Sequence, residues 1–126
     1  MIVGIGTDIL KITNIEIAVT NPEDVFIRRT YTANEIEIIN SRENPLASFA
    51  TRFAGKEAVF KSLSISPDSI RSWNDIEILE NDHGQPVVFL HGDLKKIAAD
   101  KNITTILLSL SFEKEYAIAY ATALSL

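Results

Sequence analysis

The chain has 126 residues, of which 46% are hydrophobic and 23% are charged, a composition typical of one globular domain. Its formal net charge of −5 argues against extensive binding to nucleic acid, which requires a basic surface. No apolar run reaches the roughly eighteen residues of a membrane span, and Met1–Leu10 lacks the basic segment of a signal peptide. The absence of cysteine agrees with a reducing compartment. We therefore expect one cytoplasmic domain over residues 1–126.

The first segment, Ile2–Leu10, is predicted to be a strand with one nearly bare face. Because side chains alternate along a strand, Gly4, Gly6 and Asp8 share a face with Ile2. Glycine inside a strand usually marks a bulge or the close approach of another backbone or a ligand. Two simpler interpretations remain open: an edge strand with a tight packing contact, and an aspartate that caps a turn or helix.

Three short helices are predicted to follow this strand. Lys11–Val19 and Pro22–Arg29 are the first two, and Pro22 suits a first helical turn. Thr32 and Glu35 have the spacing of a capping box, in which each side chain binds a backbone N–H at the start of a helix. This third helix should end by Asn44–Pro45, where a proline interrupts the chain.

The long helix predicted over Leu46–Leu63 carries a glutamate within its apolar face. At about 100° per residue, Glu57 falls inside a stripe made of Leu46, Phe49, Ala50, Phe53 and Phe60. A buried carboxylate without a partner is costly, so we expect a cation beside it. Lys61 is one candidate, in an i,i+4 pair that contributes only about 0.2–0.5 kcal/mol. A metal ion is the stronger alternative, and an ordinary surface salt bridge is the simplest one.

Asp8 and Glu57 together suggest a single metal site. Two hard oxygen ligands without histidine or cysteine suit Mg²⁺ better than zinc, and Mg²⁺ usually completes its shell with water and substrate phosphates. The long helix also carries Arg52, Lys56 and Lys61, so we expect a polyphosphate to lie along it. Simple solvation of these cations is the alternative.

The second half of the chain is predicted to be mainly strands. Asp75–Glu80 and Pro86–His91 form a hairpin that turns at Gly84. Gly92–Lys101 is an amphipathic helix, and Thr104–Phe112 and Glu115–Leu124 are the last two strands.

One face of the last predicted strand consists of alanines. These small side chains, Ala117, Ala119, Ala121 and Ala123, leave room for a helix to lie close on the sheet, most simply Leu46–Leu63. Helices followed by hairpins indicate an α+β fold with a mainly antiparallel sheet. We therefore expect a single domain in which a long central helix packs on that sheet.

The motifs in this order resemble the holo-acyl-carrier-protein synthase family, the short class of phosphopantetheinyl transferases. The resemblance runs from residue 2 to about residue 122 and rests on the ordered set rather than on any single motif. The motifs are G-I-G-T-D at Gly4–Asp8, R-F-A-G-K-E-A-V-F-K at Arg52–Lys61, D-I-E-I at Asp75–Ile78, H-G-Q-P at His83–Pro86 and S-L-S-F-E-K-E-Y-A at Ser109–Ala117.

This resemblance implies a transferase of fatty acid biosynthesis. Its members move phosphopantetheine from coenzyme A to a serine of apo acyl carrier protein and release 3′,5′-ADP, with Mg²⁺ as the cofactor. Asp8 and Glu57 match the family's metal ligands, and with Lys61 they are the candidate catalytic residues. The matched positions around coenzyme A are Arg52, Lys56, Lys61, Gly84 and Pro86. The resemblance also implies a homotrimer with each active site at a subunit boundary.

One position departs from the family pattern. The family usually reads S-x-S-H in its penultimate strand, where the histidine helps to hold coenzyme A, whereas this chain has Phe112. Ser109 and Ser111, in the same motif, are expected to lie near coenzyme A. The departure leaves open a module that binds coenzyme A or a nucleotide without catalysis. A Mg²⁺-dependent phosphohydrolase and a purely structural oligomer remain open as well.

The acidic carrier protein must dock on a local basic surface, because the chain as a whole is also acidic. Lys11, Arg28 and Arg29 are the expected docking residues. No other partner is expected from the sequence, neither nucleic acid nor a membrane.

Overall fold

The structure, a computed structural model, describes residues 1–21 and 23–126 and contains five helices and five strands within them. Two short 3₁₀ helices, Pro67–Ser69 and Trp73–Asp75, lie between α4 and β2. The order along the chain is β1 (Ile2–Lys11), α1 (Thr13–Thr20), α2 (Phe26–Thr30), α3 (Ala33–Asn40), α4 (Pro45–Ser62), β2 (Ile76–Glu80), β3 (Pro86–Leu90), α5 (Gly92–Asp100), β4 (Thr105–Phe112) and β5 (Tyr116–Leu124).

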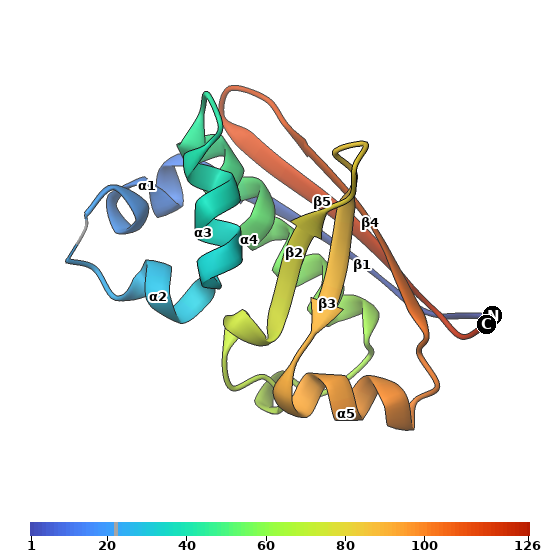
Figure 1. Cartoon of the computed structure of the whole chain (residues 1–126). Coiled ribbons are helices and arrows are strands. Elements are labelled where there is room, and N and C mark those ends of the chain that lie inside the picture. Colours follow the sequence, from blue (N-terminus) through green and yellow to red (C-terminus); the bar gives the residue numbers. More distant parts are fainter. Residues whose placement is uncertain (22) are drawn as a thin grey trace.

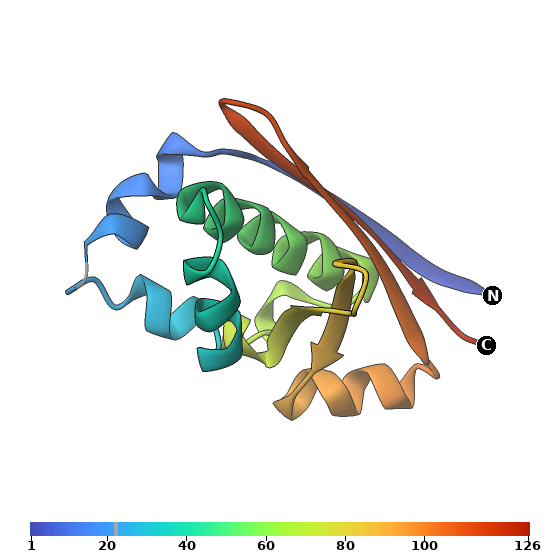
Figure 2. The same cartoon turned by 45° about the horizontal axis from the view of Figure 1, so that its top comes forward.

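The strands form two antiparallel sheets. The larger sheet has the order β1-β5-β4, and the hairpin β2-β3 forms the smaller one beside β4 (Figure 1). All helices that the structure describes lie on one side of the larger sheet, as Figure 2 shows, and none of them covers its other side. The two ends of the chain meet, since the backbones of Met1 and Ser125 are hydrogen bonded. The predicted α+β fold with a mainly antiparallel sheet is confirmed.

The face of β5 beneath α4 is made of alanine, as expected. Ala117, Ala119, Ala121 and Ala123 are almost completely buried, and α4 packs against both β5 and β1. Their short side chains let the helix lie close to the sheet, so this contact forms the centre of the hydrophobic core.

The glycines of β1 also face α4. A Cβ atom on Gly6 would lie only 1.9 Å from the carbonyl oxygen of Ala58 on the helix, so no larger residue fits this position without moving the backbone. The predicted close approach of another backbone is thus confirmed. The pairing of β1 with β5 shifts in register between Ile2 and Gly4. Because of this shift Ile2 is exposed while Val3 packs against the core, and the predicted alternation fails at that end.

The first two helices are shorter than predicted. Helix α1 begins at Thr13 because Lys11 still pairs with Tyr116 in the sheet. Helix α2 begins at Phe26, whose N–H is bound by the side chain of Asp24, and the proposed role of Pro22 in its first turn lies outside the described residues. The capping box of α3 between Thr32 and Glu35 is confirmed.

Helix α4 has the predicted bounds within one residue, but it does not have a single apolar stripe. Alanines pack on the sheet from one side, while Phe53 and Phe60 contact Trp73 on another, with ring centroids 6.0 and 5.9 Å apart. The helix is therefore buried nearly all round. Glu57 is only partly buried, and the charged residue in the core is Lys56, whose side chain is 0% exposed. The predicted placement of Glu57 in the core is therefore wrong.

The remaining elements agree with the sequence predictions within about two residues. Gly84 has φ of +77° in the turn between β2 and β3, a conformation that favours glycine. No helix within residues 1–21 and 23–126 is long and apolar enough to cross a membrane.

Candidate active site

The contact between β1 and α4 brings Asp8 and Glu57 into electrostatic contact. Asp8 follows Gly6 on the strand face that touches the helix, and Glu57 precedes Ala58, the residue that Gly6 approaches. Lys61 lies one helical turn further on, with its Nζ atom 3.4 Å from Asp8 Oδ1 and 3.0 Å from the carbonyl oxygen of Thr7. The structure thus brings three predicted catalytic residues together at one place.

The pKa values of both carboxyl groups are raised. Burial raises the pKa of Glu57, and the neighbouring charge of Asp8 raises it further, while Lys61 lowers it in part. Burial also raises the pKa of Asp8, again partly offset by Lys61. Burial is the larger cause for both groups, so a cation bound beside them would favour their charged forms.

Lys61 does not form the salt bridge with Glu57 that was one of the alternatives left open by the sequence. Among the residues that the structure describes, its ion pair is with Asp8 on the neighbouring strand. Glu57 and Lys61 are one helical turn apart on α4, as the i,i+4 spacing requires. The ammonium group of Lys61 nevertheless extends toward β1 and not toward Glu57. Glu57 is left without an ion-pair partner in the same set of residues.

This pair of carboxylates fits a hard divalent ion. Within residues 1–21 and 23–126 no group of three or more histidine, cysteine, aspartate or glutamate side chains could hold a metal. Two carboxylates would leave most of the coordination shell to water or substrate oxygens, which is the usual arrangement for Mg²⁺ and not for structural zinc. The donor atoms present therefore fit Mg²⁺.

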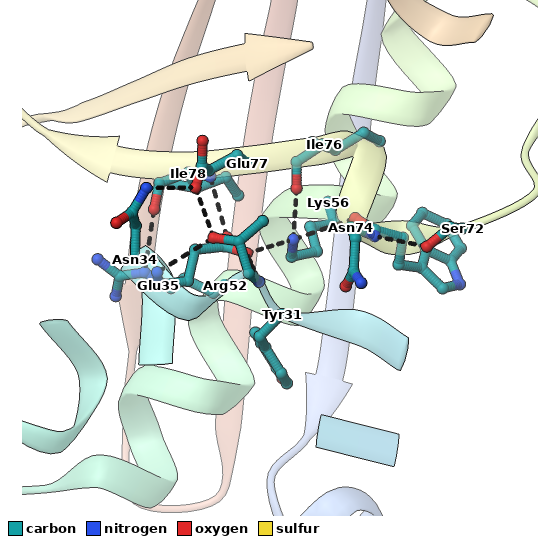
Figure 3. A network of polar contacts seen from close by, with 12 residues as sticks. Tyr31, Asn34, Glu35, Arg52, Lys56, Ser72, Asn74, Ile76, Glu77 and Ile78 are labelled. Carbon is teal, nitrogen blue, oxygen red and sulfur yellow. Dashed lines mark hydrogen bonds and ion pairs between the residues drawn. The ribbon is translucent and has the colours of Figure 1, made fainter. Parts of the chain in front are cut away.

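Lys56 is not available to a phosphate group, contrary to the sequence prediction. Its ammonium group lies inside the protein and donates to Glu35 Oε1 at 2.7 Å, to the carbonyl oxygen of Trp73 at 3.1 Å and to that of Ile76 (Figure 3). An ammonium group has three donors, so all are used. Lys56 ties α3 and β2 to α4 instead of binding a ligand.

Glu35, the ion-pair partner of Lys56, also binds two backbone N–H groups. Glu35 completes the capping box of α3, and its second oxygen accepts the N–H of Ile78 at 2.9 Å. Burial lowers the pKa of Lys56, and the adjacent carboxylate of Glu35 opposes this effect. A buried ion pair of this kind requires such additional hydrogen bonds to offset its loss of hydration.

Arg52 lies at the wall of a cavity of about 450 Å³. Its guanidinium group donates to the carbonyl oxygen of Ile78, to Ser48 and to Glu80. Gly84 and Pro86 of the hairpin and Phe112 of β4 also line this cavity. Four of the positions singled out from the sequence therefore converge here. The full lining is Arg42, Glu43, Asn44, Ser48, Thr51, Arg52, Glu80, Gly84, Pro86, Leu110 and Phe112.

Ser109 and Ser111 do not line this cavity. They pair with Tyr120 and Ile118 of β5 and alternate with Leu110 and Phe112, which face the cavity. Both serines therefore lie on the other face of β4, where they are exposed. The two serines therefore do not face the cavity of their own chain.

The carboxylate pair and the cavity lie on different sides of α4. Arg52 and Lys61 are nine positions apart, which corresponds to about 180° around a helix, and Glu57 is about 140° from Arg52. Consequently, Arg52 and Lys61 of one chain do not face the same place on α4, whereas we expected from the sequence that a polyphosphate would lie along Arg52, Lys56 and Lys61. In one chain the carboxylate pair and the cavity are thus two separate places.

The expected docking residues are exposed but lie on two elements. Arg28 and Arg29 form the last turn of α2, next to a cavity of about 650 Å³ that Arg29, Phe26, Phe53 and Trp73 help to line. Lys11 is at the end of β1 and pairs with Tyr116. A basic surface with an apolar hollow is thus present at α2.

Sequence reasoning missed two charged residues of the cavity beside Arg52. Arg42 follows α3, and Glu80 ends β2; their side chains form an ion pair that also includes Arg52. Neither residue stands in a recognisable local pattern, because the three elements that bring them together are far apart in the chain. Only the tertiary structure reveals this cluster.

Comparisons with known proteins show which family the chain resembles along its length. A family model described as the 4'-phosphopantetheinyl transferase superfamily matches residues 4–121. The holo-[acyl-carrier-protein] synthase of Chlamydia pneumoniae is 39% identical over 98% of both chains. That of Caldanaerobacter subterraneus subsp. tengcongensis is 37% identical over 98% of this chain and 95% of its own.

Solved structures show the same fold along the whole chain. The holo-[acyl-carrier-protein] synthase from Neisseria meningitidis superposes with a TM-score of 0.86 at 31% identity, covering 98% of this chain and 99% of that one. The holo-[acyl-carrier-protein] synthase from Helicobacter pylori, solved in complex with coenzyme A, superposes with a TM-score of 0.81 at 29% identity. The match covers 95% of this chain and 99% of that one. The chain therefore belongs to the 4'-phosphopantetheinyl transferase superfamily.

Proposed function

We propose that this protein is a holo-[acyl-carrier-protein] synthase, which transfers phosphopantetheine from coenzyme A to a serine of apo acyl carrier protein. Relatives that carry this name match nearly the full chain, and one of the similar structures holds coenzyme A. The observation that carries the proposal is the meeting of Asp8, Glu57 and Lys61 at the contact of β1 with α4. A cytoplasmic role in fatty acid biosynthesis stays a prediction.

The reaction requires control of charge more than covalent participation of the protein. The serine oxygen bonds to the β-phosphorus of coenzyme A, the bond from this phosphorus to the bridging oxygen breaks, and 3′,5′-ADP leaves. The serine proton passes to Glu57 or to water. Asp8 and Glu57 would hold Mg²⁺, which when bound supplies neutralisation of the diphosphate charge.

Lys61 would add a mobile positive charge to the same site. Its ammonium group is exposed, and its contact with Asp8 is a long one. Bound diphosphate can therefore share this ammonium group without breaking a buried interaction. We propose that Lys61 stabilises the leaving 3′,5′-ADP as negative charge develops on it.

We propose that the nucleotide end of coenzyme A occupies the cavity lined by Arg52, Gly84 and Pro86. Because this cavity and the carboxylate pair lie on different sides of α4, one coenzyme A molecule would extend between two chains. The nucleotide would bind in the cavity of one chain, and the diphosphate would reach Asp8 and Glu57 of the next.

A homotrimer would provide this juxtaposition. The side of the larger sheet that faces away from α4, here called the outer sheet face, carries large apolar side chains that are at least 44% exposed. They are Ile5, Ile9, Leu107, Tyr116, Ile118 and Tyr120. Exposed apolar surface of this extent is typical of a protein interface, and Figure 2 shows no helix over it.

We propose that acyl carrier protein docks at α2. Arg28 and Arg29 can pair with acidic groups there, and the adjacent cavity beside Phe26, Phe53 and Trp73 can receive an apolar side chain. This combination suits an acidic partner better than charge alone, because apolar contacts supply affinity that salt does not screen. Lys11, on β1, would contribute from the edge of the outer sheet face.

Asp8→Asn and Glu57→Gln should each reduce transfer by at least about 100-fold, because each removes one of two metal ligands. The assay is mass spectrometry of apo acyl carrier protein after incubation with coenzyme A and Mg²⁺, which detects the added phosphopantetheine. Asp100→Asn, which makes the same charge change at an exposed position on α5, should retain full activity. Near-normal transfer by either site variant, with its fold intact by circular dichroism, would refute the metal site.

The same assay separates the competing functions. A binding module without catalysis would retain coenzyme A and release no 3′,5′-ADP. A phosphohydrolase would consume coenzyme A when no carrier protein is present. The wild-type chain should leave coenzyme A intact when no carrier protein is present. With the apo carrier, it should release 3′,5′-ADP together with modification of the carrier.

Reversing both charges in Arg28→Glu/Arg29→Glu should raise KM for apo acyl carrier protein by about tenfold or more and leave KM for coenzyme A unchanged, because the variant repels an acidic partner. Steady-state kinetics with each substrate varied in turn measures the two values. Lys95→Glu/Lys96→Glu, an adjacent exposed pair on α5, is the matched control. An unchanged KM for the carrier would place docking elsewhere.

Sedimentation equilibrium should give the mass of three 14.0 kDa chains for the wild-type protein. Ile118→Glu should dissociate the trimer and abolish transfer, since it places a charge in the apolar outer sheet face. Ile17→Glu changes an exposed isoleucine on α1 and should preserve the trimer. A wild-type protein that is monomeric at concentrations where it is active would contradict the shared site.

A further inference from the structure

The cavity beside Arg52 contains a second arginine whose donors are largely free. Arg42 forms an ion pair with Glu80, and its side chain is 43% exposed. In the part of the chain that the structure describes, this is its only side-chain ion pair or hydrogen bond. A guanidinium group has five N–H donors, so several donors of Arg42 remain available at the cavity.

Arg52 has much less capacity to bind an additional anion. Its side chain is only 4% exposed, and all three of its nitrogen atoms already donate, to Ile78, Ser48 and Glu80. The only other charged groups lining the cavity, among the described residues, are the carboxylates Glu43 and Glu80. The positive charge that an incoming anion can use therefore resides mainly on Arg42.

Phe112 supplies no charge to this cavity. It lies in the cavity wall, and a phenyl ring neither carries charge nor donates a hydrogen bond. Phe112 can contact a nucleobase through its ring. Any phosphate on the nucleotide must then find its cationic partner elsewhere on the wall.

We infer that Arg42 recognises the 3′-phosphate of coenzyme A. This inference rests on the proposed function, because it assumes that the cavity holds the nucleotide. Glu80 holds the guanidinium groups of Arg42 and Arg52 side by side at the wall. The phosphate would bind to the free edge of Arg42, which makes Arg42 the residue that distinguishes coenzyme A from its 3′-dephospho form.

Titration calorimetry with 3′,5′-ADP and with 5′-AMP tests this inference without requiring transfer. Arg42→Gln should weaken binding of 3′,5′-ADP by about 10- to 100-fold, the usual range for loss of a charged hydrogen bond. Binding of 5′-AMP, which lacks the 3′-phosphate, should change less than about twofold. Arg71→Gln removes another exposed arginine that is paired with a carboxylate, Asp93, and should change neither value.

Kinetics with coenzyme A and with 3′-dephospho-coenzyme A gives a second readout. Arg42→Gln should raise KM for coenzyme A selectively and leave kcat nearly unchanged. Equal effects on both members of each ligand pair, or no effect, would overturn the role of Arg42 while wild-type transfer still upholds the proposed function. A wild-type protein that neither binds these nucleotides nor transfers phosphopantetheine would instead overturn the proposed function and the inference with it.

Discussion

Helix α4 lies close to the larger sheet because β1 and β5 present mainly glycine and alanine to it. Gly6 approaches the backbone of the helix at Ala58, and the alanine face of β5 extends this contact. The distance between helix and sheet is therefore set by backbone and methyl groups, which cannot adapt as flexible side chains do. Asp8 lies next to this contact on β1, and Glu57 lies next to it on α4. The contact therefore determines the distance between the two carboxyl groups.

On the side of α4 that faces α3 and β2, the helix is held by the polar contacts of the buried Lys56. Lys56 joins α4 to α3 through Glu35, to β2 through the carbonyl group of Ile76 and to the preceding 3₁₀ helix through that of Trp73. Buried ion pairs often contribute little net stability, but they are strongly directional when every donor is satisfied. The network thus fixes the rotation of α4 about its own axis. With this rotation, Glu57 faces β1 while Arg52 faces the cavity by the hairpin.

The sequence predicted local features well and the orientation of α4 poorly. The bare face of β1, the capping box at Thr32 and the hairpin turn at Gly84 each depend on neighbours in the chain, and the structure confirms them. The apolar stripe around Glu57 was misleading because α4 is covered on several sides. Helical periodicity identifies a buried face only when there is one such face. The roles of Lys56 and Arg42 depend on partners in distant segments, so no local pattern could predict them.

A divided site is the consequence of these two constraints. The carboxylate pair and the cavity beside Arg52 are both present in one chain, yet they lie on different sides of the same helix. Under the proposed function, assembly of chains is then a requirement of catalysis. The apolar outer sheet face supplies a surface on which such assembly can occur.

The central claim is that Asp8 and Glu57 share one divalent ion at the contact of β1 with α4. Anomalous diffraction from crystals grown with Mn²⁺ and coenzyme A tests it most directly, because manganese can replace magnesium and is visible by its own scattering. We predict a single strong peak within bonding distance of carboxylate oxygens from both residues, with the diphosphate of coenzyme A beside it. A peak on other ligands, or ordered coenzyme A with no ion between Asp8 and Glu57, would contradict the account.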